Sequence, residues 1–242
     1  MTQEDLLEGQ VLLVDKPMEW TSFQVIGKLR WIFKIKKIGH AGTLDPLATG
    51  LLIICTGKFT KKINEYMGME KEYTGTITLG ATTPTYDLES EPTDFKQFTP
   101  FTKEQLTEAT NPFIGPIQQV PPAHSAIQVN GKRAYDLARQ GKEVKLEPRP
   151  VVIHSFEITG IDLPKVNFKV VCSTGTYIRS LANDYGKVLG CGGYLSALCR
   201  TRIGNFLLSD AKTPQEIEVA YKEDQLKKIS QLPGTELSTL LS

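Results

Sequence analysis

The hydrophobic positions of the chain follow two spacings, one typical of helices and one typical of strands. Apolar residues recur every three or four positions from Phe23 to Phe33, directly after the capping residues Thr21 and Ser22, which predicts a helix. Short apolar or alternating runs between prolines, glycines and polar residues predict strands instead. These runs are Gln10–Pro17, Leu51–Thr56, Glu72–Leu79, Val151–Ile158 and Val166–Ser173.

The remaining segments divide into helices, loops and a hairpin. Helical spacing recurs at Thr60–Met67, from Thr102, at Ala134–Gln140, at Tyr177–Leu189 and from Thr213. Glycines and a proline predict a loop over Ile38–Gly50, prolines and acids predict another over Thr82–Phe101, and Asn130–Gly131 predicts a hairpin turn. We therefore expect an α+β fold, a mixed, mainly antiparallel sheet flanked by helices, with loop-rich insertions.

Composition indicates a folded protein without a membrane partner. Of the 242 residues, 40% are hydrophobic, which is enough for one large core or two small ones. The longest apolar run, Leu51–Cys55, is the length of a strand and not of a membrane span. The first residues are acidic and polar, unlike an export signal. We expect a cytoplasmic protein.

The sequence shows no motif that binds a metal or a cofactor. The four cysteines form no C-x-x-C pair, and the three histidines lie apart from them in sequence. Neither a G-x-G-x-x-G motif after a strand nor a Walker loop occurs. We therefore expect no cofactor and no metal, which disfavours a cofactor-dependent uridine methyltransferase and a metal-dependent hydrolase.

The net charge of +1 conceals an uneven distribution. Residues 81–110 carry a net charge of −4, residues 128–150 carry +3 and residues 161–204 carry +4. A polyanion is able to bind one face while another stays acidic, although proteins that bind no RNA also show such separation. Three lysines after the first predicted helix suit either a solvated helix end or phosphate contact: Lys34, Lys36 and Lys37.

The most informative segment is the predicted loop Gly39-His-Ala-Gly-Thr-Leu-Asp-Pro-Leu-Ala-Thr-Gly50. By composition alone, Asp45 before a proline is an ordinary turn residue. The full string, however, resembles the G-x-L-D-P-x-A-x-G signature of the TruB-type tRNA pseudouridine synthases, in which the aspartate is the essential carboxylate. Further blocks resemble this family in the same order: Val14–Pro17, Lys71–Tyr73, Pro121–Ala126, Gly131–Gly141, Cys172–Ser180 and Gly190–Arg200.

The resemblance implies the pseudouridine synthase fold and an enzyme that isomerises uridine to pseudouridine in the T-loop of tRNA, at position 55. The reaction breaks the N1–C1′ bond, rotates the uracil and rejoins it through C5, and it requires no cofactor. A carboxylate is able to add to C1′ or to deprotonate C2′ while the uracil leaves. The resemblance assigns this role to Asp45 and leaves both routes open.

Two further catalytic residues are implied by the resemblance. Tyr73 is expected to stack on the flipped uracil, because an aromatic ring stacks on any nucleobase. It is also a candidate proton acceptor. Arg179 pairs with the catalytic aspartate, which keeps a partly buried carboxylate ionised. Taken by themselves, Tyr73 also suits a strand aromatic in the core, and Arg179 suits a surface position on a helix.

Four residues are expected to bind the substrate. His40 resembles the histidine that takes the vacated place beside the T-loop, and Tyr177 and Leu198 match positions that line the uracil pocket. Lys16 matches a basic residue near the active site, where it either contacts phosphate or has a structural role. The alternatives are a solvated loop residue for His40 and core packing for Tyr177 and Leu198.

An insertion at about 124–152 resembles the segment with which the family grips RNA. Its part from Lys132 to Arg149 carries six basic residues around Tyr135, which suit phosphate contact and stacking, although a solvated basic hairpin has the same composition. Two positions depart from the family pattern, His124 in place of an aromatic residue and Gln128 in place of a lysine. Both are expected to change RNA contacts rather than the chemistry.

The resemblance also sets the expected domains and partners. We expect a catalytic domain over 1–210 and a helical tail over 211–242, without the PUA domain of typical bacterial members, which disfavours a guide-dependent role. The expected partner is tRNA, through its T-loop and T-stem, with no DNA, no obligate protein partner and a monomeric state. The alternative is a non-catalytic tRNA-binding or tRNA-folding protein that retains the fold, which the presence of Asp45, Tyr73 and Arg179 disfavours.

Overall fold

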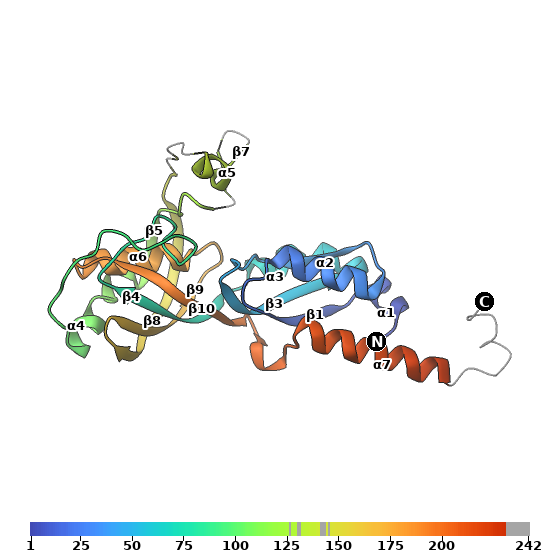
Figure 1. The fold of residues 1–242 in the computed structure, drawn as a ribbon. Coiled ribbons are helices and arrows are strands. Elements are labelled where there is room, and N and C mark those ends of the chain that lie inside the picture. The colour runs from blue at the N-terminus through green and yellow to red at the C-terminus, as the bar shows by residue number, and fades with distance from the viewer. Residues whose placement is uncertain (126, 130–131, 141–143, 145, 231–242) are drawn as a thin grey trace. The chain divides into compact units, whose positions relative to one another are not determined.

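The computed structural model describes residues 1–125, 127–129, 132–140, 144 and 146–230 (Figure 1). The chain forms two compact units, one from residues 1–67 with the segment from Asn205 onward, the other from residues 68–204. Among the described helices, none combines the length and the apolar character that crossing a membrane requires.

The first unit is an antiparallel sheet covered by helices. Its elements are α1 (Gln3–Glu8), β1 (Val11–Lys16), α2 (Ser22–Phe33), β2 (Ile38–Ala41), β3 (Ala48–Thr56), the 3-10 helix η1 (Gly57–Lys62), α3 (Ile63–Gly68), β11 (Phe206–Leu207), the 3-10 helix η3 (Leu208–Asp210) and α7 (Pro214–Ser230). Strand β3 pairs antiparallel with β1, where Val14 lies opposite Leu52, and with β2, where His40 lies opposite Ile54.

The core of this unit lies between the sheet and helix α2, and α7 extends it. A capping box at Thr21 and Gln24 begins α2, which buries its apolar stripe. Side chains from α1, α2, β1, β3 and α7 form one buried hydrophobic cluster. The rings of Phe33 and Tyr221 meet edge to face with centroids 5.0 Å apart, and Lys28 forms an ion pair with Glu218. The tail helix is therefore part of the core of the unit that carries Asp45.

The second unit is a twisted antiparallel sheet with helices and a small hairpin. Its elements are β4 (Lys71–Leu79), α4 (Lys103–Glu108), the 3-10 helix η2 (Asn111–Phe113), β5 (Gly115–Gln119), β6 (Gln128–Val129), β7 (Lys132–Arg133), α5 (Ala134–Arg139), β8 (Arg149–Asp162), β9 (Lys165–Cys172), α6 (Ile178–Val188) and β10 (Gly193–Ile203). The strand order is β10-β4-β9-β8-β5, and every neighbouring pair is antiparallel.

Helix α6 packs on this sheet at very close range. A Cβ atom at Gly186 would lie 2.1 Å from the main-chain nitrogen of Gly193 on β10, so any side chain there would push the helix away. Aromatic rings also join α6 to the sheet. The ring of Phe156 on β8 contacts those of Phe168 on β9 and Tyr185 on α6, with centroid distances of 5.8 and 5.4 Å. The position of α6 matters for the candidate site because its first turn carries Arg179, one of the residues predicted to be catalytic.

The structure confirms the α+β fold with a mainly antiparallel sheet, and it corrects several local predictions. The predicted loop over Ile38–Gly50 was wrong at both ends, because Ile38–Ala41 pairs with β3, which already begins at Ala48. Strand β10 was missed, since register shifts at Leu195/Ala197 and Arg200/Arg202 break its alternation of apolar and polar residues. Helix α1 was missed as well.

Substitution of Phe33 with alanine is expected to lower the free energy of unfolding by about 3 kcal/mol, because the ring is fully buried between α2 and α7. Phe23→Ala removes the same atoms from the exposed side of the same helix and should change stability by no more than about 0.5 kcal/mol. Urea denaturation followed by circular dichroism measures both. Equal losses would contradict the assignment of the two helix faces.

Candidate active site

Asp45 lies in the loop between β2 and β3, and its neighbours on both sides are bonded to other residues. The Ser22 side chain accepts the N–H of Leu44 at 2.9 Å and donates to the carbonyl oxygen of Leu44 at 3.2 Å. The carbonyl oxygen of Asp45 accepts the N–H of Ala48 at 3.1 Å, which closes a turn. These bonds hold the main chain around a carboxylate that is partly buried.

Lys16 provides a further anchor for this loop. Its side chain is 0% exposed, and Nζ donates to the carbonyl oxygens of Pro17 at 2.9 Å, Trp20 at 2.5 Å and Pro46 at 3.3 Å. The N–H of Glu19 donates to the same Pro46 oxygen at 2.9 Å. A buried ammonium group requires such acceptors, because desolvation penalises an uncompensated charge. The ammonium group of Lys16 therefore holds the residue that follows Asp45.

His40 lies on β2, in the same unit and five residues before Asp45. It stands opposite Ile54 of β3, and its side chain is partly buried. The flanking residues Ile38 and Ala41 are buried. His40 is therefore held by a strand pairing rather than by a free loop.

Tyr73 and Leu198 lie on the same face of the sheet in the second unit. Tyr73 of β4 stands opposite Arg200 of β10, and Leu198 stands opposite Gly75. Partners across an antiparallel pair project to the same face, as do residues two apart on one strand. The fold thus brings together two of the residues that were expected to contact the uracil.

Buried positive charge accompanies Tyr73 on this face. Lys71, two residues earlier on β4, is buried, and so is Arg200. Burial, reinforced by the positive charge of Arg200, lowers the pKa of Lys71 to about 8. Nζ of Lys71 donates to the carbonyl oxygen of Met69 at 2.5 Å. This face of β4 therefore remains cationic at neutral pH.

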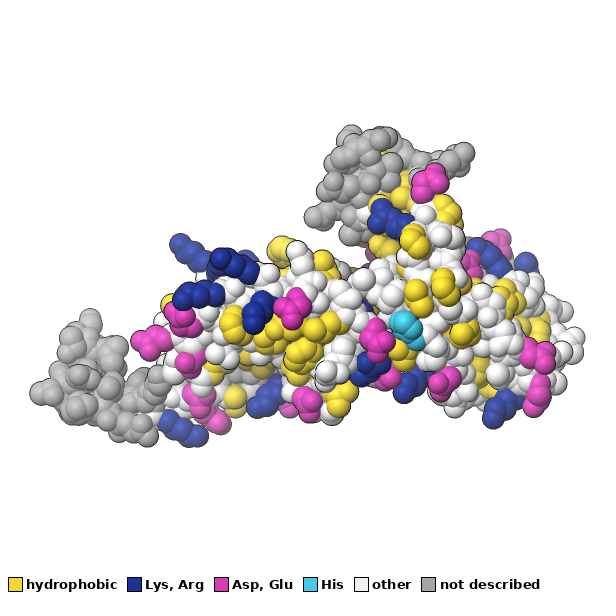
Figure 2. All heavy atoms as spheres, turned by 180° about the vertical axis from the view of Figure 1, so that it is seen from behind, with side chains coloured by type: hydrophobic (Ala, Val, Ile, Leu, Met, Phe, Trp, Pro, Cys, Tyr) yellow, Lys and Arg dark blue, Asp and Glu magenta, His cyan; other side chains and the backbone are white. Residues whose placement is uncertain are grey.

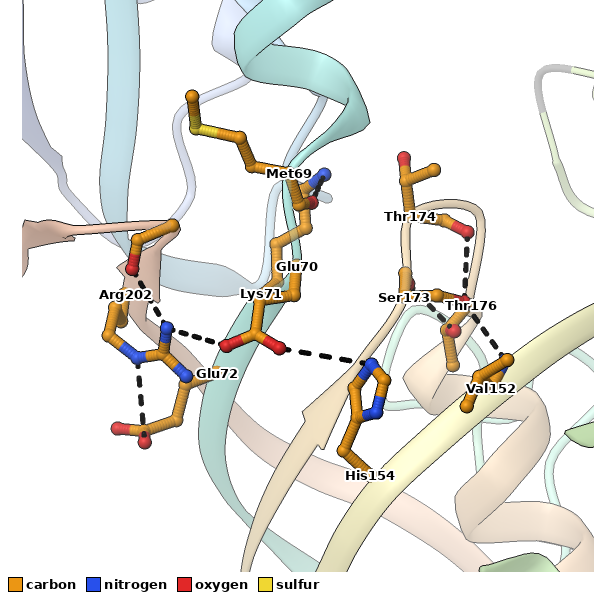
Figure 3. Close-up of polar contacts among 11 residues, drawn as sticks. Met69, Glu70, Lys71, Glu72, Val152, His154, Ser173, Thr174, Thr176 and Arg202 are labelled. Atoms are coloured by element: carbon orange, nitrogen blue, oxygen red, sulfur yellow. Dashed lines mark hydrogen bonds and ion pairs between the residues drawn. The ribbon is translucent and has the colours of Figure 1, made fainter. Parts of the chain in front are cut away.

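A network of charged side chains surrounds the beginning of β4 (Figure 3). Arg202 lies between two carboxylates, with Nη1 2.8 Å from Oε1 of Glu70 and Nε 3.9 Å from Oε2 of Glu72. Nε2 of His154 lies 3.8 Å from the other oxygen of Glu70. Burial opposes the ionisation of Glu72, but hydrogen bonds and two neighbouring cations hold its pKa below the usual value. The network links β4, β8 and β10 beside Tyr73.

Arg179 is held by three residues from two loops of the second unit. It is 5% exposed, Nη1 donates to the carbonyl oxygen of Thr85 at 3.3 Å, and Nη2 donates to that of His124 at 3.1 Å. Nε lies 3.6 Å from Oδ2 of Asp87, which is also buried. Hydrogen bonds and a buried ion pair therefore determine the direction of the guanidinium group.

Tyr177 immediately precedes α6 and is held through its main chain. Oε1 of the buried Gln119 accepts the N–H of Tyr177 at 2.8 Å, and Nε2 donates to its carbonyl oxygen at 3.1 Å. Ser180 donates to the carbonyl oxygen of Val120 at 2.8 Å. These bonds attach the first turn of α6 to the end of β5 and so position Arg179.

Only part of the predicted RNA-gripping insertion belongs to the described residues. The predicted hairpin is confirmed by the pairing of β6 with β7, while Lys142 and Lys145 lie outside the described residues. The ring of His124 lies edge to face with that of Tyr135, with centroids 6.4 Å apart. Figure 2 shows basic, acidic and apolar side chains interspersed on one face of the molecule. Several basic side chains lie close together at the upper left of this view.

Comparison with known proteins identifies the family. A family model described as "TruB family pseudouridylate synthase (N terminal domain)" matches residues 30–178. The chain belongs to the TruB family. A second family model, described as "tRNA pseudouridylate synthase B C-terminal domain", matches residues 179–238. This TruB-family protein is therefore an enzyme, an isomerase that forms pseudouridine, and the predicted family is confirmed.

Three curated relatives of this TruB-family chain carry the name tRNA pseudouridine synthase B. The protein from Flavobacterium johnsoniae is 50% identical over 234 residues, which cover 94% of this chain and 100% of the relative. The protein from Parabacteroides distasonis is 47% identical and covers 92% of this chain and 97% of its own length. The protein from Chlorobaculum tepidum is 51% identical, with 84% and 87% covered.

Two solved structures share the fold of this TruB-family protein. One, described as "Crystal Structure of a Cbf5-Nop10-Gar1 Complex", matches with a TM-score of 0.66 and 28% identity, covering 85% of this chain and 51% of that chain. The other, described as "Structure of H/ACA RNP bound to a substrate RNA containing 2'-deoxyuridine", matches with a TM-score of 0.68 and 26% identity, covering 91% and 56%. This chain spans little more than half of each, and the likeness confirms the pseudouridine synthase fold.

Sequence reasoning missed three residues that position the family's motifs in this chain. Ser22 was interpreted only as a helix cap and Asp87 only as part of a loop, and Gln119 was assigned no role. Their partners are distant in sequence, 58 positions in the case of Gln119 and Tyr177, so no local pattern marks them. A buried acid in a loop, or a buried amide at a strand end, becomes visible only when the fold brings its partner near.

Substitution of Asp87 with asparagine is expected to lower kcat for pseudouridine formation by roughly tenfold and to leave KM nearly unchanged, because Arg179 loses a charged partner that directs it. The protein should also unfold at a lower temperature. Glu91→Gln removes an exposed carboxylate from the same loop and should have wild-type kinetics and stability. Wild-type kcat in Asp87→Asn would show that the ion pair does not position Arg179.

Proposed function

We propose that this enzyme isomerises uridine to pseudouridine in the T-loop of tRNA, at position 55, with Asp45 as the catalytic carboxylate. The observation that carries the proposal is the anchoring of the Asp45 loop, in which Ser22 binds Leu44 and Lys16 binds Pro46. A carboxylate that attacks a sugar carbon must be aimed, and a main chain bonded on both sides of Asp45 supports that aim. The tRNA substrate follows from the shared name of the curated relatives.

The face of β4 that carries Tyr73 supports a role in holding the extruded uracil. A base that leaves its stack needs a new stacking partner, and Tyr73 and Leu198 provide an aromatic and an apolar surface on one face of the sheet. The buried cations Lys71 and Arg200 lie on the same face of the sheet and make the surroundings of Tyr73 electropositive, which suits a polyanionic substrate. Tyr177, at the beginning of α6, completes the proposed uracil-binding set.

Arg179 is proposed to keep the catalytic carboxylate ionised, and His40 to take the place that the uridine vacates. The buried environment of Arg179 supports the first role, because a guanidinium group with few water contacts acts on nearby charge with little screening. The strand position of His40, close in sequence to Asp45, supports the second. Lys16 is proposed to position the loop through its bonds to main-chain oxygens.

The proposed reaction uses no cofactor, since the uracil is both the leaving group and the incoming nucleophile. The catalytic domain is proposed to span residues 1–210, with α7 packed on the core of the unit that carries Asp45. We further propose a cytoplasmic monomer that binds the T-loop and T-stem of tRNA without a protein partner. The relatives named tRNA pseudouridine synthase B match this chain over nearly their whole length, which supports a role for the chain by itself.

Tritium release from a tRNA transcript labelled with [5-³H]uridine tests the reaction and its site. The wild type should release one tritium per tRNA, because the C5 hydrogen leaves when C5 joins the sugar, and the labelled position should map to the T-loop. Asp45→Asn, which preserves shape and removes the charge, should release none while it still binds tRNA. Asp210→Asn, an exposed control, should behave as the wild type.

Each result separates two hypotheses. Binding of tRNA by the wild type without any tritium release would contradict the enzymatic function and support a tRNA-folding protein. Release from positions outside the T-loop would preserve the chemistry and contradict the proposed site. Full release by Asp45→Asn would exclude Asp45 as the essential carboxylate.

Two substitutions of Tyr73 separate stacking from proton transfer. Tyr73→Phe preserves the stacking ring and removes the hydroxyl group, so we expect kcat to fall by about 100-fold or more with tRNA affinity unchanged. Tyr73→Ala should lose affinity for tRNA as well, because the ring is absent. Single-turnover kinetics and filter binding measure the two effects. Wild-type kcat in Tyr73→Phe would limit Tyr73 to stacking.

A further inference from the structure

Helix α2 presents an exposed aromatic and basic face that the proposed reaction does not use. Phe23 and Trp31 are 74% and 68% exposed, whereas aromatic side chains of this size are usually largely buried. Arg30 is exposed and lies within about 20° of Phe23 around the helix axis. Lys34, the C-cap residue of α2, is exposed as well. The opposite face of α2 is buried in the core of the first unit. We call Phe23, Gly27, Arg30, Trp31 and Lys34 the outer face of α2.

Gly27 lies one turn after Phe23 and one turn before Trp31 on this outer face. Glycine in the middle of a helix destabilises it relative to alanine. A Cβ atom at Gly27 would meet no atom within 4 Å, so internal packing does not account for a glycine at this position. A helix surface without a side chain between two aromatic rings allows a flat or extended ligand to approach the main chain closely.

The charge around the outer face favours a polyanion as its ligand. From Trp20 to Leu44 the sequence contains five basic residues and neither aspartate nor glutamate. One of the five, Lys28, forms an ion pair with Glu218 of α7, so the charge of the outer face comes from Arg30 and the lysines at its end. Lys36 and Lys37, which follow the helix, are exposed. Exposed aromatics interleaved with cations are typical of surfaces that bind single-stranded nucleic acid, whereas lysine is depleted in protein–protein interfaces. Charge complementarity therefore selects RNA over a protein partner.

The outer face begins next to the catalytic loop. Ser22 precedes Phe23 and is bonded to both main-chain groups of Leu44, which precedes Asp45. The 12 residues of α2 extend about 18 Å, roughly the length of five stacked nucleotides. An RNA strand that leaves the reacting uridine along α2 would therefore pass both aromatic rings.

We propose that the outer face of α2, together with Lys36 and Lys37, is a second RNA-binding surface that holds the strand next to the modified uridine. Phe23 and Trp31 stack on unpaired bases or riboses, and Arg30 and the lysines contact phosphates. The proposal rests on the proposed function, because it assigns this surface to the same RNA substrate. The surface contributes to substrate affinity and takes no part in bond breaking.

Intrinsic fluorescence reports on this surface directly. The chain has two tryptophans, Trp20 and Trp31, so Trp31 is the only one left in Trp20→Phe. Titration of Asp45→Asn/Trp20→Phe with an unmodified tRNA transcript should quench Trp31 emission and saturate at one RNA per protein. Unchanged Trp31 emission at saturation, with binding verified by filter retention, would overturn the proposal.

Two charge-matched triple variants test the cations. Lys34→Gln/Lys36→Gln/Lys37→Gln should weaken tRNA binding roughly tenfold, lower the slope of log Kd against log salt by about 2, and leave kcat within about twofold. Lys103→Gln/Lys165→Gln/Lys187→Gln removes three exposed lysines of the second unit and should change Kd much less. Trp31→Ala should raise KM roughly tenfold at unchanged kcat.

The outcomes distinguish this inference from the proposed function. Equal weakening in both triple variants would show a general charge effect and overturn the second binding surface. A concentration-dependent dimer in sedimentation that Trp31→Ala abolishes, with unchanged Kd for tRNA, would overturn it as well and assign the outer face to a second copy. Absence of tritium release from tRNA in the wild type would contradict the proposed function alone, since Trp31 quenching reports RNA binding independently of catalysis.

Discussion

The loop of Asp45 has little regular structure of its own, so its shape depends on buried side chains that bind its main chain. Lys16 imposes the strongest constraint, because an ammonium group without water must have its hydrogens accepted by other atoms. Carbonyl oxygens of three residues meet this requirement, and the one from Pro46 belongs to the loop. Ser22 binds the other side of Asp45. Loop and buried cation therefore stabilise each other, and both depend on the core that holds β1 and α2.

The second unit uses the same physical device. Gln119 binds both main-chain groups of Tyr177, and Arg179 binds two carbonyl oxygens and a buried carboxylate. Each bond joins segments that are far apart in sequence, so the direction of Arg179 depends on the complete fold of this unit. Buried polar groups with all partners present specify one arrangement strongly, because any alternative leaves one of them unsatisfied. Such rigidity suits a reaction that requires aimed groups rather than mobile ones.

Helix α2 has different tasks on its different faces. Its apolar stripe packs on β1, β3 and α7, and its first turn binds the loop that carries Asp45. Its remaining face carries exposed aromatic rings and basic side chains, which hydrophobic burial alone would disfavour. The exposure of these rings has a cost in solubility that a binding role for the outer face would explain.

Local patterns in the sequence determined the main strands and helices, the antiparallel α+β class and, through the motif around Asp45, the family. These features rest on interactions between neighbours in the chain, such as the capping box at Thr21 and the alternation along Glu72–Leu79. Strands β2 and β10 were not predictable, because β2 is short and glycine-bearing and β10 is broken by register shifts. The buried roles of Lys16, Asp87 and Gln119 were decided by tertiary structure alone, since the partners of Asp87 and Gln119 lie dozens of residues away and burial is a property of the fold. The sequence motif thus identified the family and the candidate residues of the site, whereas the contacts that hold these residues are created only by the folded chain.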